Sequence, residues 1–434
     1  MKINERIRHG NSLSGLILPF SALVIYIILV WFLSRPLAGW FFLKKADEQG
    51  LISAVKFDGN NATYHYMLGR YYHLNLVSPD LDRAALHYSR SLMLSPLQAG
   101  AWIDISKVYQ TKGNGKEAEY ALERAVRLSP NNPDLMWEAG TFWLINNMTD
   151  KAVGALRQYI LLMPDMQTKA YDLCWKLDLG NGYITGNLVP DSYEYRAGYL
   201  AYLINTGRVE ESEEVWQTID NNSLQKDLFI LYVNFLINNS RYDSAGAVWD
   251  NITSKIEGKK RDDVSSPVWN PDFEDDILNG GFDWVVREAE GADVFLDDTI
   301  RMTGSRSVGV TFDGKHNPDV TIIQQVVRVS PGAKYTLRGY VKTASLTTTN
   351  GIFFSIQGHN CSGFNKRSDV ITGTNFWREV ILNFETPADC RAVTINARRE
   401  RSGKFDNKIE GTAWIDGITL KQQADLPKTG FKKP

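Results

Sequence analysis

Side chains that could carry out catalysis are thinly spread along this chain of 434 residues. Its six histidines include His65 and His73, two turns apart on a predicted helix, but no acidic or cysteine partner follows them at metal-site spacing. The acid pairs Asp275-Asp276 and Asp297-Asp298 are adjacent in sequence, whereas glycoside hydrolysis needs two carboxyls facing each other about 5 to 9.5 Å apart. No nucleophile elbow, phosphate loop or dinucleotide fingerprint occurs in its required context. We therefore predict a non-enzymatic protein, with these acids in turns and His65 packed inside the fold.

The net charge limits the kinds of partner that this chain could bind, and its cysteines bear on metal sites and on the compartment. The formal net charge of −2 argues against a nucleic-acid partner. None of the three cysteines belongs to a two-residue-spaced pair, so neither a zinc ribbon nor a redox motif is predicted. Cys361 and Cys390 could form a disulfide in an oxidising compartment, or stay reduced. Cys174 follows a helical pattern and is expected to be a buried apolar residue.

An apolar segment near the N-terminus approaches the length of a membrane span. Residues 16–33 are almost wholly apolar and uncharged, and about 20 such residues cross a bilayer. This apolar core exceeds the roughly 7 to 15 residues of a cleavable signal sequence. It continues into aromatic and aliphatic residues typical of an interfacial belt, namely Leu37, Trp40, Phe41 and Phe42.

We therefore predict a cytoplasmic tail at residues 1–13 and a single transmembrane anchor with its belt at residues 14–43, with a cleaved signal as the alternative. Basic residues flank the segment on both sides, which leaves its orientation open. We favour a bacterial inner-membrane protein with the bulk of the chain in the periplasm.

Three prolines, Pro96, Pro130 and Pro164, recur every 34 residues, and an apolar pattern recurs between them. This pattern is similar to the tetratricopeptide repeat, a helical hairpin whose large residues pack into the small residues of its neighbour. We predict a tetratricopeptide-like solenoid at residues 44–255, with a break or bend near Gly180 and two degenerate hairpins after it. The pattern is carried by Trp102, Ile105, Ser106, Tyr109, Ala118, Leu122 and Ala125, and then by Met136, Ala139, Gly140, Trp143, Ala152, Leu156 and Tyr159.

The repeat resemblance also implies a binding surface. In such repeats, the first-helix residues that do not serve packing form a concave wall, which suits an extended peptide or a partner helix. The alternative is that aromatic residues among them simply pack within the array. On this chain the residues are Tyr66, Arg70, His73, Lys107, Gln110 and Trp137.

Beyond the repeats, helical periodicity gives way to alternation. Residues 256–268 are polar and charged and are predicted to be a linker. Short alternating segments separated by turns then predict a β-sandwich at residues 269–422, followed by a disordered tail at residues 423–434. These segments are 307–312, 320–329, 335–342, 352–358, 378–384, 392–398 and 412–420.

Motifs at both ends of this region, Asn270-Pro271-Asp272-Phe273-Glu274 and Ala413-Trp414-Ile415-Asp416-Gly417-Ile418, resemble the jelly-roll carbohydrate-binding modules of bacterial glycan-processing proteins. That family often holds one structural calcium between its first and last strands. The resemblance implies Glu274 and Asp416 as its ligands, with Asp272 as a third. Gly417 replaces an acid that the family usually has, which leaves the calcium open.

Alternation within the strands suggests a sugar-binding face. If Tyr335 and Leu337 point inward, Arg338 and Tyr340 point outward. Planar polar groups around an exposed aromatic ring suit a sugar, although a solvated sheet face is the alternative. Three further residues could share this surface: Gln357, Asn396 and Arg398. The large side chains expected in the core instead are Trp284, Trp377 and Trp414.

Together these features predict a multidomain protein with a transmembrane helix, an all-α tetratricopeptide-like solenoid and an all-β jelly-roll sandwich. The function they favour is a non-catalytic scaffold of the bacterial envelope that docks a protein partner and binds a polysaccharide, in exopolysaccharide or O-antigen assembly. Two alternatives stay open. The sandwich could serve only protein–protein interaction, or a glycan-active site could be assembled across the domains.

Overall fold

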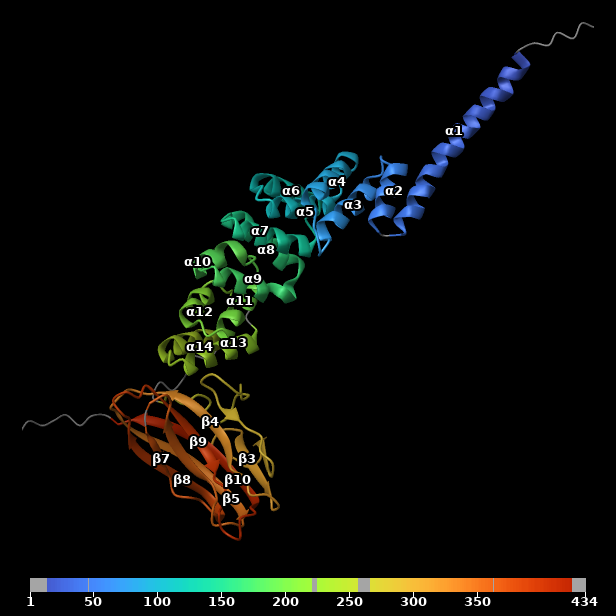
Figure 1. The fold of residues 1–434 in the computed structure, drawn as a ribbon. Coiled ribbons are helices and arrows are strands. Elements are labelled where there is room, and N and C mark those ends of the chain that lie inside the picture. Colours follow the sequence, from blue (N-terminus) through green and yellow to red (C-terminus); the bar gives the residue numbers. More distant parts are fainter. Residues whose placement is uncertain (1–13, 46, 221–224, 257–265, 362, 424–434) are drawn as a thin grey trace, which may run out of the picture. The chain divides into compact units, whose positions relative to one another are not determined.

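The computed structural model describes residues 14–45, 47–220, 225–256, 266–361 and 363–423, and the chain divides into two compact units, residues 1–190 and 191–434. The predicted N-terminal tail, residues 257–265 of the predicted linker and residues 424–434 of the predicted tail lie outside the described residues. Helices precede two antiparallel sheets (Figure 1), which confirms the predicted fold class.

The first helix, α1 (Ser14–Leu43), is continuous from the apolar segment through the predicted interfacial belt. Its residues Ser21–Leu43 are apolar and long enough to cross a membrane, and only 6% of their most apolar window is buried. This exposure is unlike a core helix and leaves a membrane anchor or a signal sequence. The end of α1 nevertheless packs on protein, because the ring of Phe42 stacks on that of Phe57 at 5.2 Å and Arg35 Nε donates to the Phe57 carbonyl at 2.9 Å.

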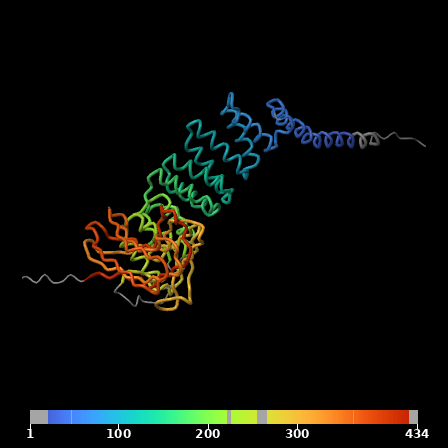
Figure 2. The backbone as a smooth tube through the Cα atoms, turned by 90° about the horizontal axis from the view of Figure 1, so that it is seen from below, coloured from blue at the N-terminus to red at the C-terminus, as the bar shows by residue number. Residues whose placement is uncertain are grey.

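Helical hairpins follow one another through the first unit, and Figure 2 shows their successive turns as a stack. A π-helical turn, Ile184–Leu188, closes the unit just before Pro190, in the segment where the sequence predicts a break. The helices are α2 (Glu48–Phe57), α3 (Ala62–Leu74), α4 (Leu81–Leu94), α5 (Ala99–Thr111), α6 (Gly115–Leu128), α7 (Pro133–Ile145), α8 (Thr149–Leu162), α9 (Gln167–Lys176) and α10 (Asn181–Tyr183), with a 3₁₀ turn at Pro164–Met166.

Local sequence explains where these helices begin, end and touch. The side chain of Asn132 caps α7 by accepting from the Leu135 amide at 3.2 Å, and Pro133 opens the helix. Each repeat proline stands two residues after the end of α4, α6 or α8, where it cannot continue the helix. A Cβ added at Gly140 would lie 2.7 Å from Leu156. Large residues therefore do pack into small ones, as the repeat pattern predicts.

The second unit begins with two hairpins, α11 (Tyr193–Asn205) with α12 (Val209–Trp216), and α13 (Lys226–Asn238) with α14 (Tyr242–Ile256). Gly207 and Ser240 have φ values of 72° and 62° at the two inter-helix turns. Such left-handed residues commonly end a helix. The two degenerate hairpins of the sequence are therefore confirmed, although compactness groups them with the strands rather than with the preceding repeats.

The sandwich consists of two five-stranded antiparallel sheets, ordered β1-β4-β9-β6-β7 (sheet A) and β2-β3-β10-β5-β8 (sheet B). All seven predicted strands are present, while β1, β2 and β7 are additional. The strands are β1 (Val285–Val286), β2 (Ala292–Asp297), β3 (Ser307–Asp313), β4 (Val320–Arg328), β5 (Lys334–Leu346), β6 (Phe353–Gly358), β7 (Asn365–Arg367), β8 (Gly373–Glu385), β9 (Ala392–Arg399) and β10 (Glu410–Gln422).

One apolar core fills the space between the sheets, and Trp284 is fully buried in it, as predicted. Trp414 is 8% exposed but does not belong to this core. It is paired with Lys342, whose ammonium lies 5.7 Å from its ring, and its indole N–H donates to Asp297 at 2.8 Å. Trp414 is therefore buried, as predicted, but outside the core cluster between the sheets.

The last hairpin contacts the sandwich through an aromatic cluster. The ring of Trp249 on α14 packs edge-on against Trp269 at 5.5 Å and Phe282 at 6.0 Å. A Cβ at Gly281, whose φ is 63°, would lie 2.1 Å from Trp249, so glycine is needed for this close approach. The Tyr242 hydroxyl also donates to the His359 carbonyl at 3.0 Å. Helices and strands of the second unit thus share a packed interface.

The structure decides the alternative left open for Cys361 and Cys390 and confirms the burial predicted for Cys174. Cys361 and Cys390 form a disulfide, with their Cα atoms 5.1 Å apart. Cys174 on α9 is fully buried, and burial raises the pKa of its thiol to about 11. A buried thiol of this kind behaves as a small apolar residue.

Candidate functional site

A polar cleft of about 280 Å³ lies on the outer face of sheet A. The strands expose this face because Phe354 and Ile356 of β6 and Ile395 of β9 point into the core, so the residues between them point outward. Three strands and the residue after β9 line the cleft. The lining residues are Phe353, Ser355, Gln357, Asn365, Arg367, Arg398 and Glu400.

Strand register places these side chains beside one another. Ser355 on β6 is opposite Arg367 on β7, and Gln357 is opposite Asn365. On the other side of β6, Phe353 is opposite Arg398 of β9. Residues directly opposite on one sheet face are close enough to act on one ligand.

Two ion pairs orient the charged groups of the cleft. Arg398 Nη2 donates to Asp319 Oδ1 at 2.7 Å, and Arg367 Nη1 donates to Glu400 Oε2 at 3.3 Å. The Arg398 side chain is 22% exposed and that of Arg367 is 62% exposed. Each guanidinium therefore presents fixed donors to the cleft, since Arg carries five N–H groups.

The predicted glycan-binding residues do not share one face. Gln357, Asn396 and Arg398 lie on the outer face of sheet A, where Gln357 and Arg398 line the cleft and Asn396 is buried beside it. Arg338 and Tyr340 belong to β5 of sheet B, where Arg338 Nη1 donates to Glu379 at 2.8 Å. The prediction of a common surface is therefore wrong, because alternation separates inside from outside but does not assign a strand to a sheet. Whether any of the five binds sugar stays a prediction.

Asn365, Arg367 and Glu400 are cleft residues that the sequence did not reveal. Asn365 and Arg367 belong to β7, whose three residues are too short for alternation to stand out. Glu400 follows the last residue of β9. The basic stretch around Arg398 was the only available signal, and it does not specify a cleft.

The predicted calcium ligands hold a loop in place. Asp416, fully buried at the end of the sandwich, accepts hydrogen bonds from the amides of Met302 at 2.7 Å, Thr303 at 2.9 Å and Gly417 at 2.7 Å. The Thr303 hydroxyl also donates to Asp272 at 2.8 Å. Burial raises the pKa of Asp416, although these amide hydrogen bonds oppose the shift.

Glu274 is engaged in the same way. It accepts from the amide and hydroxyl of Ser305 at 2.7 and 2.6 Å and from the Arg306 amide at 3.2 Å. Burial raises the pKa of Glu274, but these hydrogen bonds outweigh it and lower the pKa overall. Calcium would have to compete with N–H and O–H donors at both acids, and no cluster of three acidic, histidine or cysteine side chains suited to a metal occurs within the described residues. A calcium site here stays a prediction.

In the first unit, the residues of the predicted concave wall connect one repeat to the next. Tyr66 donates to Asp104 at 2.9 Å, and burial followed by the charge of Asp104 raises the pKa of Tyr66 to about 12. Lys107 on α5 pairs with Glu138 on α7 at 3.0 Å. The structure therefore brings these predicted residues together as a ladder of inter-repeat contacts.

The remaining members of that wall contact the next repeat, contact their own hairpin or are exposed. Arg70 lies 3.8 Å from Asp104, and His73 Nδ1 lies 3.2 Å from the Tyr88 hydroxyl. The Lys169 ammonium sits 3.9 Å from the ring centroid of Trp137. Gln110 is exposed. Packing between repeats accounts for most of these side chains, and partner binding by them stays a prediction.

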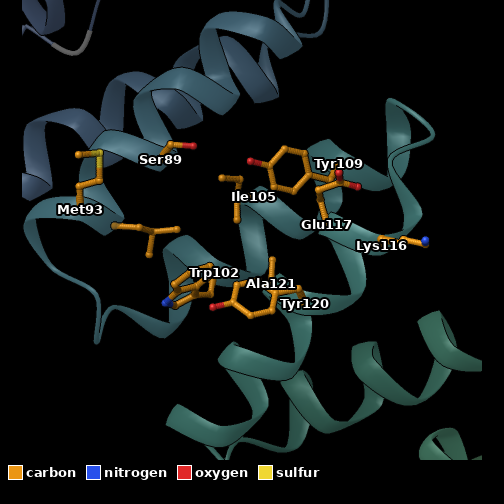
Figure 3. A pocket seen from close by; sticks show the side chains of 10 residues that line it. Ser89, Met93, Trp102, Ile105, Tyr109, Lys116, Glu117, Tyr120 and Ala121 are labelled. Atoms are coloured by element: carbon orange, nitrogen blue, oxygen red, sulfur yellow. The ribbon is translucent and has the colours of Figure 1, made fainter.

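A second surface of the repeats, the α4–α6 groove, is a mainly apolar groove of about 490 Å³. Figure 3 shows Met93 of α4 on one side and Trp102 and Tyr120 on the other, with Ile105 between them. The rings of Trp102 and Tyr120 meet edge-on at 5.9 Å. The groove contains none of the residues predicted for the concave wall. Its members are Ser89, Leu92, Met93, Trp102, Ile105, Tyr109, Lys116, Glu117, Tyr120 and Ala121.

The next repeat carries an equivalent groove of about 440 Å³, the α6–α8 groove. Eight of its ten lining residues follow lining residues of the α4–α6 groove by 34 positions. Here Glu123, Arg127 and Lys151 stand where the first groove has Ser89, Met93 and Glu117. Lys151 Nζ lies 2.8 Å from Glu123. The members are Glu123, Val126, Arg127, Pro130, Met136, Trp143, Lys151, Gly154, Ala155 and Gln158.

A comparison with protein families finds a match within the sandwich. Residues 266–399 match the sequence model of a family described as a carbohydrate binding domain, which contains the cleft residues up to Arg398. No curated protein matches the chain.

Several solved structures resemble parts of the chain. The enzymatically active domain of tailspike protein 4 from bacteriophage CBA120 is 15% identical with a TM-score of 0.27, and the match covers 36% of this chain but only 21% of that one. A CBM4 structure is 18% identical with a TM-score of 0.27, covering 36% of this chain and 99% of that one. YrrB, a tetratricopeptide protein with an unusual peptide-binding site, is 19% identical with a TM-score of 0.26, covering 49% and 94%.

Proposed function

We propose that the sandwich binds a glycan in the cleft of sheet A. The observation that carries this proposal is the match of residues 266–399 to a carbohydrate binding domain, in a region whose outer sheet face holds a polar cleft. Amide, hydroxyl and guanidinium groups from three strands meet there, and sugar hydroxyls need several fixed partners of this kind. A carbohydrate-binding domain of this kind is not itself catalytic, and we extend that property to the whole chain.

The helical part would present this module and dock a protein partner. The α4–α6 groove suits an apolar segment of the partner, because Met93 is 73% exposed and Tyr120 is 54% exposed beside the half-buried ring of Trp102. Helical-repeat grooves commonly take an amphipathic helix or an extended peptide. The partner would thus be held by the repeats while the sandwich holds the sugar.

The setting that we propose is a bacterial inner membrane, with α1 as a single-span anchor and the bulk of the chain in the periplasm. The disulfide between Cys361 and Cys390 supports an oxidising compartment. A membrane-held protein with a glycan-binding module suits exopolysaccharide or O-antigen assembly. Extraction of membranes at alkaline pH tests the anchor: intact α1 should stay in the pellet, and a shortened N-terminus in the supernatant would contradict it.

The test of glycan binding uses the full chain in lipid nanodiscs, since alkyl maltoside detergents carry sugar head groups. We expect saturable binding to members of a glycan panel, weakened about tenfold or more when Gln357→Ala and Asn365→Ala are combined, because each side chain supplies hydrogen bonds. Tyr340→Ala on sheet B is the matched control and should bind normally. Normal binding by the cleft variant with loss in Tyr340→Ala would place the site on the other sheet.

A scaffold that binds no sugar is the second candidate, and one observation favours it. The ring of Phe353 in the cleft is only 2% exposed, so the cleft lacks an open aromatic surface for stacking a sugar. A blank glycan panel together with capture of a protein partner by the repeats would support this candidate.

A further inference from the structure

The charged groups of the sheet A cleft indicate which class of glycan it would take, and this inference rests on the proposed function. Two guanidinium groups, Arg367 and Arg398, and one carboxylate, Glu400, line the cleft. Asp319 binds one edge of Arg398 from outside the lining, and Glu400 pairs with Arg367, so the charges balance. A negatively charged ligand would therefore bind through the guanidinium N–H groups that these two ion pairs leave free.

Two buried polar atoms of the cleft residues lack partners. Ser355 is 2% exposed, and its hydroxyl oxygen has no hydrogen-bond partner among the described residues. The Nε atom of Arg398 is likewise buried and unpaired there. Buried polar groups usually have hydrogen-bond partners, so two such atoms without partners at one site point to a missing ligand or to water.

A sugar ring cannot stack on an aromatic side chain in this cleft. The Arg367 guanidinium carbon lies 5.8 Å from the ring centroid of Phe353, whose face is buried. The half-exposed Tyr340 and the buried Trp414 belong to sheet B. The cleft must therefore hold its ligand by hydrogen bonds and charge. Its volume of about 280 Å³ is at the small end of ligand sites, which suits one substituted sugar ring better than a stretch of buried polymer.

We propose that the cleft recognises a glycan whose sugar carries a carboxylate, as a uronic acid does. Arg398 and Arg367 bind the carboxylate, because a planar guanidinium matches the two oxygens of a planar carboxylate. Ser355, Gln357 and Asn365 bind the ring hydroxyls. Asp319 and Glu400 hold the two guanidinium groups in place.

The experiment measures binding of the full chain in nanodiscs by calorimetry. The probes are oligosaccharides of galacturonate, of mannuronate and of hyaluronan, each paired with the neutral oligosaccharide made by reducing its carboxyl groups. A sulfated galactan oligosaccharide separates carboxylate recognition from general anion binding. We expect at least one acidic probe to bind and its reduced partner to bind tenfold or more weakly, with affinity falling as salt rises.

Variants assign the effect to the arginines. Arg398→Gln should weaken the acidic probe about tenfold or more, and Arg398→Lys should lose most of the same affinity because it keeps charge without the planar fork. Arg338→Gln removes an equally ion-paired arginine from sheet B and should bind normally. An unchanged far-UV circular dichroism spectrum and melting temperature show that each variant is folded.

The outcomes are distinguishable from failure of the proposed function. Equal binding of an acidic probe and its reduced partner would overturn the carboxylate inference while leaving glycan binding intact. Equal binding of sulfated and carboxylated probes would overturn it in favour of a general anion site. A chain that binds none of the probes, acidic or neutral, would overturn both.

Discussion

The α4–α6 and α6–α8 grooves are the same surface one repeat apart, yet their chemistry differs. Their packing positions match, with Ala121 and Ala155 in equivalent places. The differences lie at positions that the repeat pattern leaves free, where Met93, Glu117 and Tyr120 are replaced by Arg127, Lys151 and Gly154. Ion pairs link Glu123 to Arg127 and Lys151 in the second groove, while the charged residues of the first are Lys116 and Glu117.

The preceding repeat extends this comparison. In the preceding repeat, the position of Ala121 is taken by His87, 34 residues earlier. The position of Trp102 is taken by His65, because an insertion around residues 78–80 shifts the first helix of that repeat. These two histidines meet with their Nδ1 atoms 3.1 Å apart and their rings stacked at 5.4 Å. Three repeats therefore place a histidine pair, an apolar groove and an ion-paired groove on one scaffold. The repeat pattern determines shape, and the free positions determine what the shape can bind.

The largest effect is expected at a packing position that the two repeats share but fill with different residues. Gly140→Val places a Cβ 2.7 Å from Leu156 and should lower the free energy of unfolding by about 1–3 kcal/mol through overpacking. Ser106 occupies the same repeat position one repeat earlier and already has a Cβ, so Ser106→Ala should cost about 1 kcal/mol or less. Urea unfolding followed by circular dichroism measures both. A loss at Gly140→Val no larger than that at Ser106→Ala would contradict the close approach of Leu156 to Gly140.

The next effect should separate the grooves. Met93→Arg copies Arg127 into the α4–α6 groove and should weaken an apolar helical probe peptide about tenfold, since burying a methionine contributes about 1.5–3 kcal/mol. Arg127→Met in the α6–α8 groove is the reciprocal variant and should add little, because Glu123 and Lys151 stay paired there. Fluorescence anisotropy of the labelled peptide reports both affinities. Unchanged binding by Met93→Arg would show that this groove is not the peptide site.

The histidine pair should make the preceding repeat sensitive to pH. Burial, ahead of the other influences, lowers the pKa of both His65 and His87 below the usual 6.5. The unfolded chain then binds protons more readily, so stability should fall as the pH drops below about 6.5. His87→Ala copies Ala121 and should flatten this dependence. Protection of the α3 and α4 amides from hydrogen exchange, measured between pH 7.5 and 5.5, tests this pH dependence. If the stability of His87→Ala depends on pH as steeply as that of the unmodified chain, the histidine pair is not its cause.

The smallest effect is expected from the ion pairs of the α6–α8 groove. Lys151 is paired with Glu119 and Glu123, but its side chain is 46% exposed, so solvent and salt weaken the attraction. Lys151→Ala should lower the melting temperature slightly at low salt and not at 1 M salt. Glu117→Ala at the equivalent position of the α4–α6 groove should do nothing at either salt concentration. A loss in Lys151→Ala that persists at high salt would indicate packing rather than charge.

Much of the fold follows from the sequence because the signals are local. Each repeat proline marks a helix end, and Gly140 or Ala139 marks where a neighbour approaches. Alternation likewise gives seven strands and separates core residues such as Ile395 from outward ones. The short strand β7 was not predicted, because three residues are too few to display a period of two.

The cleft could not be assembled from the sequence because it depends on which strands share a sheet. Tyr340 and Asn396 both point outward, but β5 and β9 belong to different sheets. Glu400 lies beyond its strand, where no pattern operates. The contacts of the concave-wall residues could not be predicted either, since nothing local reveals that Asp104 on the next repeat accepts a hydrogen bond from Tyr66.

The continuity of α1 has a mechanical consequence. Its end is clamped, since a Cβ at Gly39 would meet the Tyr64 ring at 2.6 Å and the Tyr64 hydroxyl donates to the Pro36 carbonyl at 3.3 Å. In the anchored form that we propose, these contacts fix the first hairpin to the end of the membrane helix. A span longer than the local hydrocarbon thickness can tilt to fit it. A thinner membrane would therefore increase the tilt of the helix, and the adjoining repeats would rotate with it.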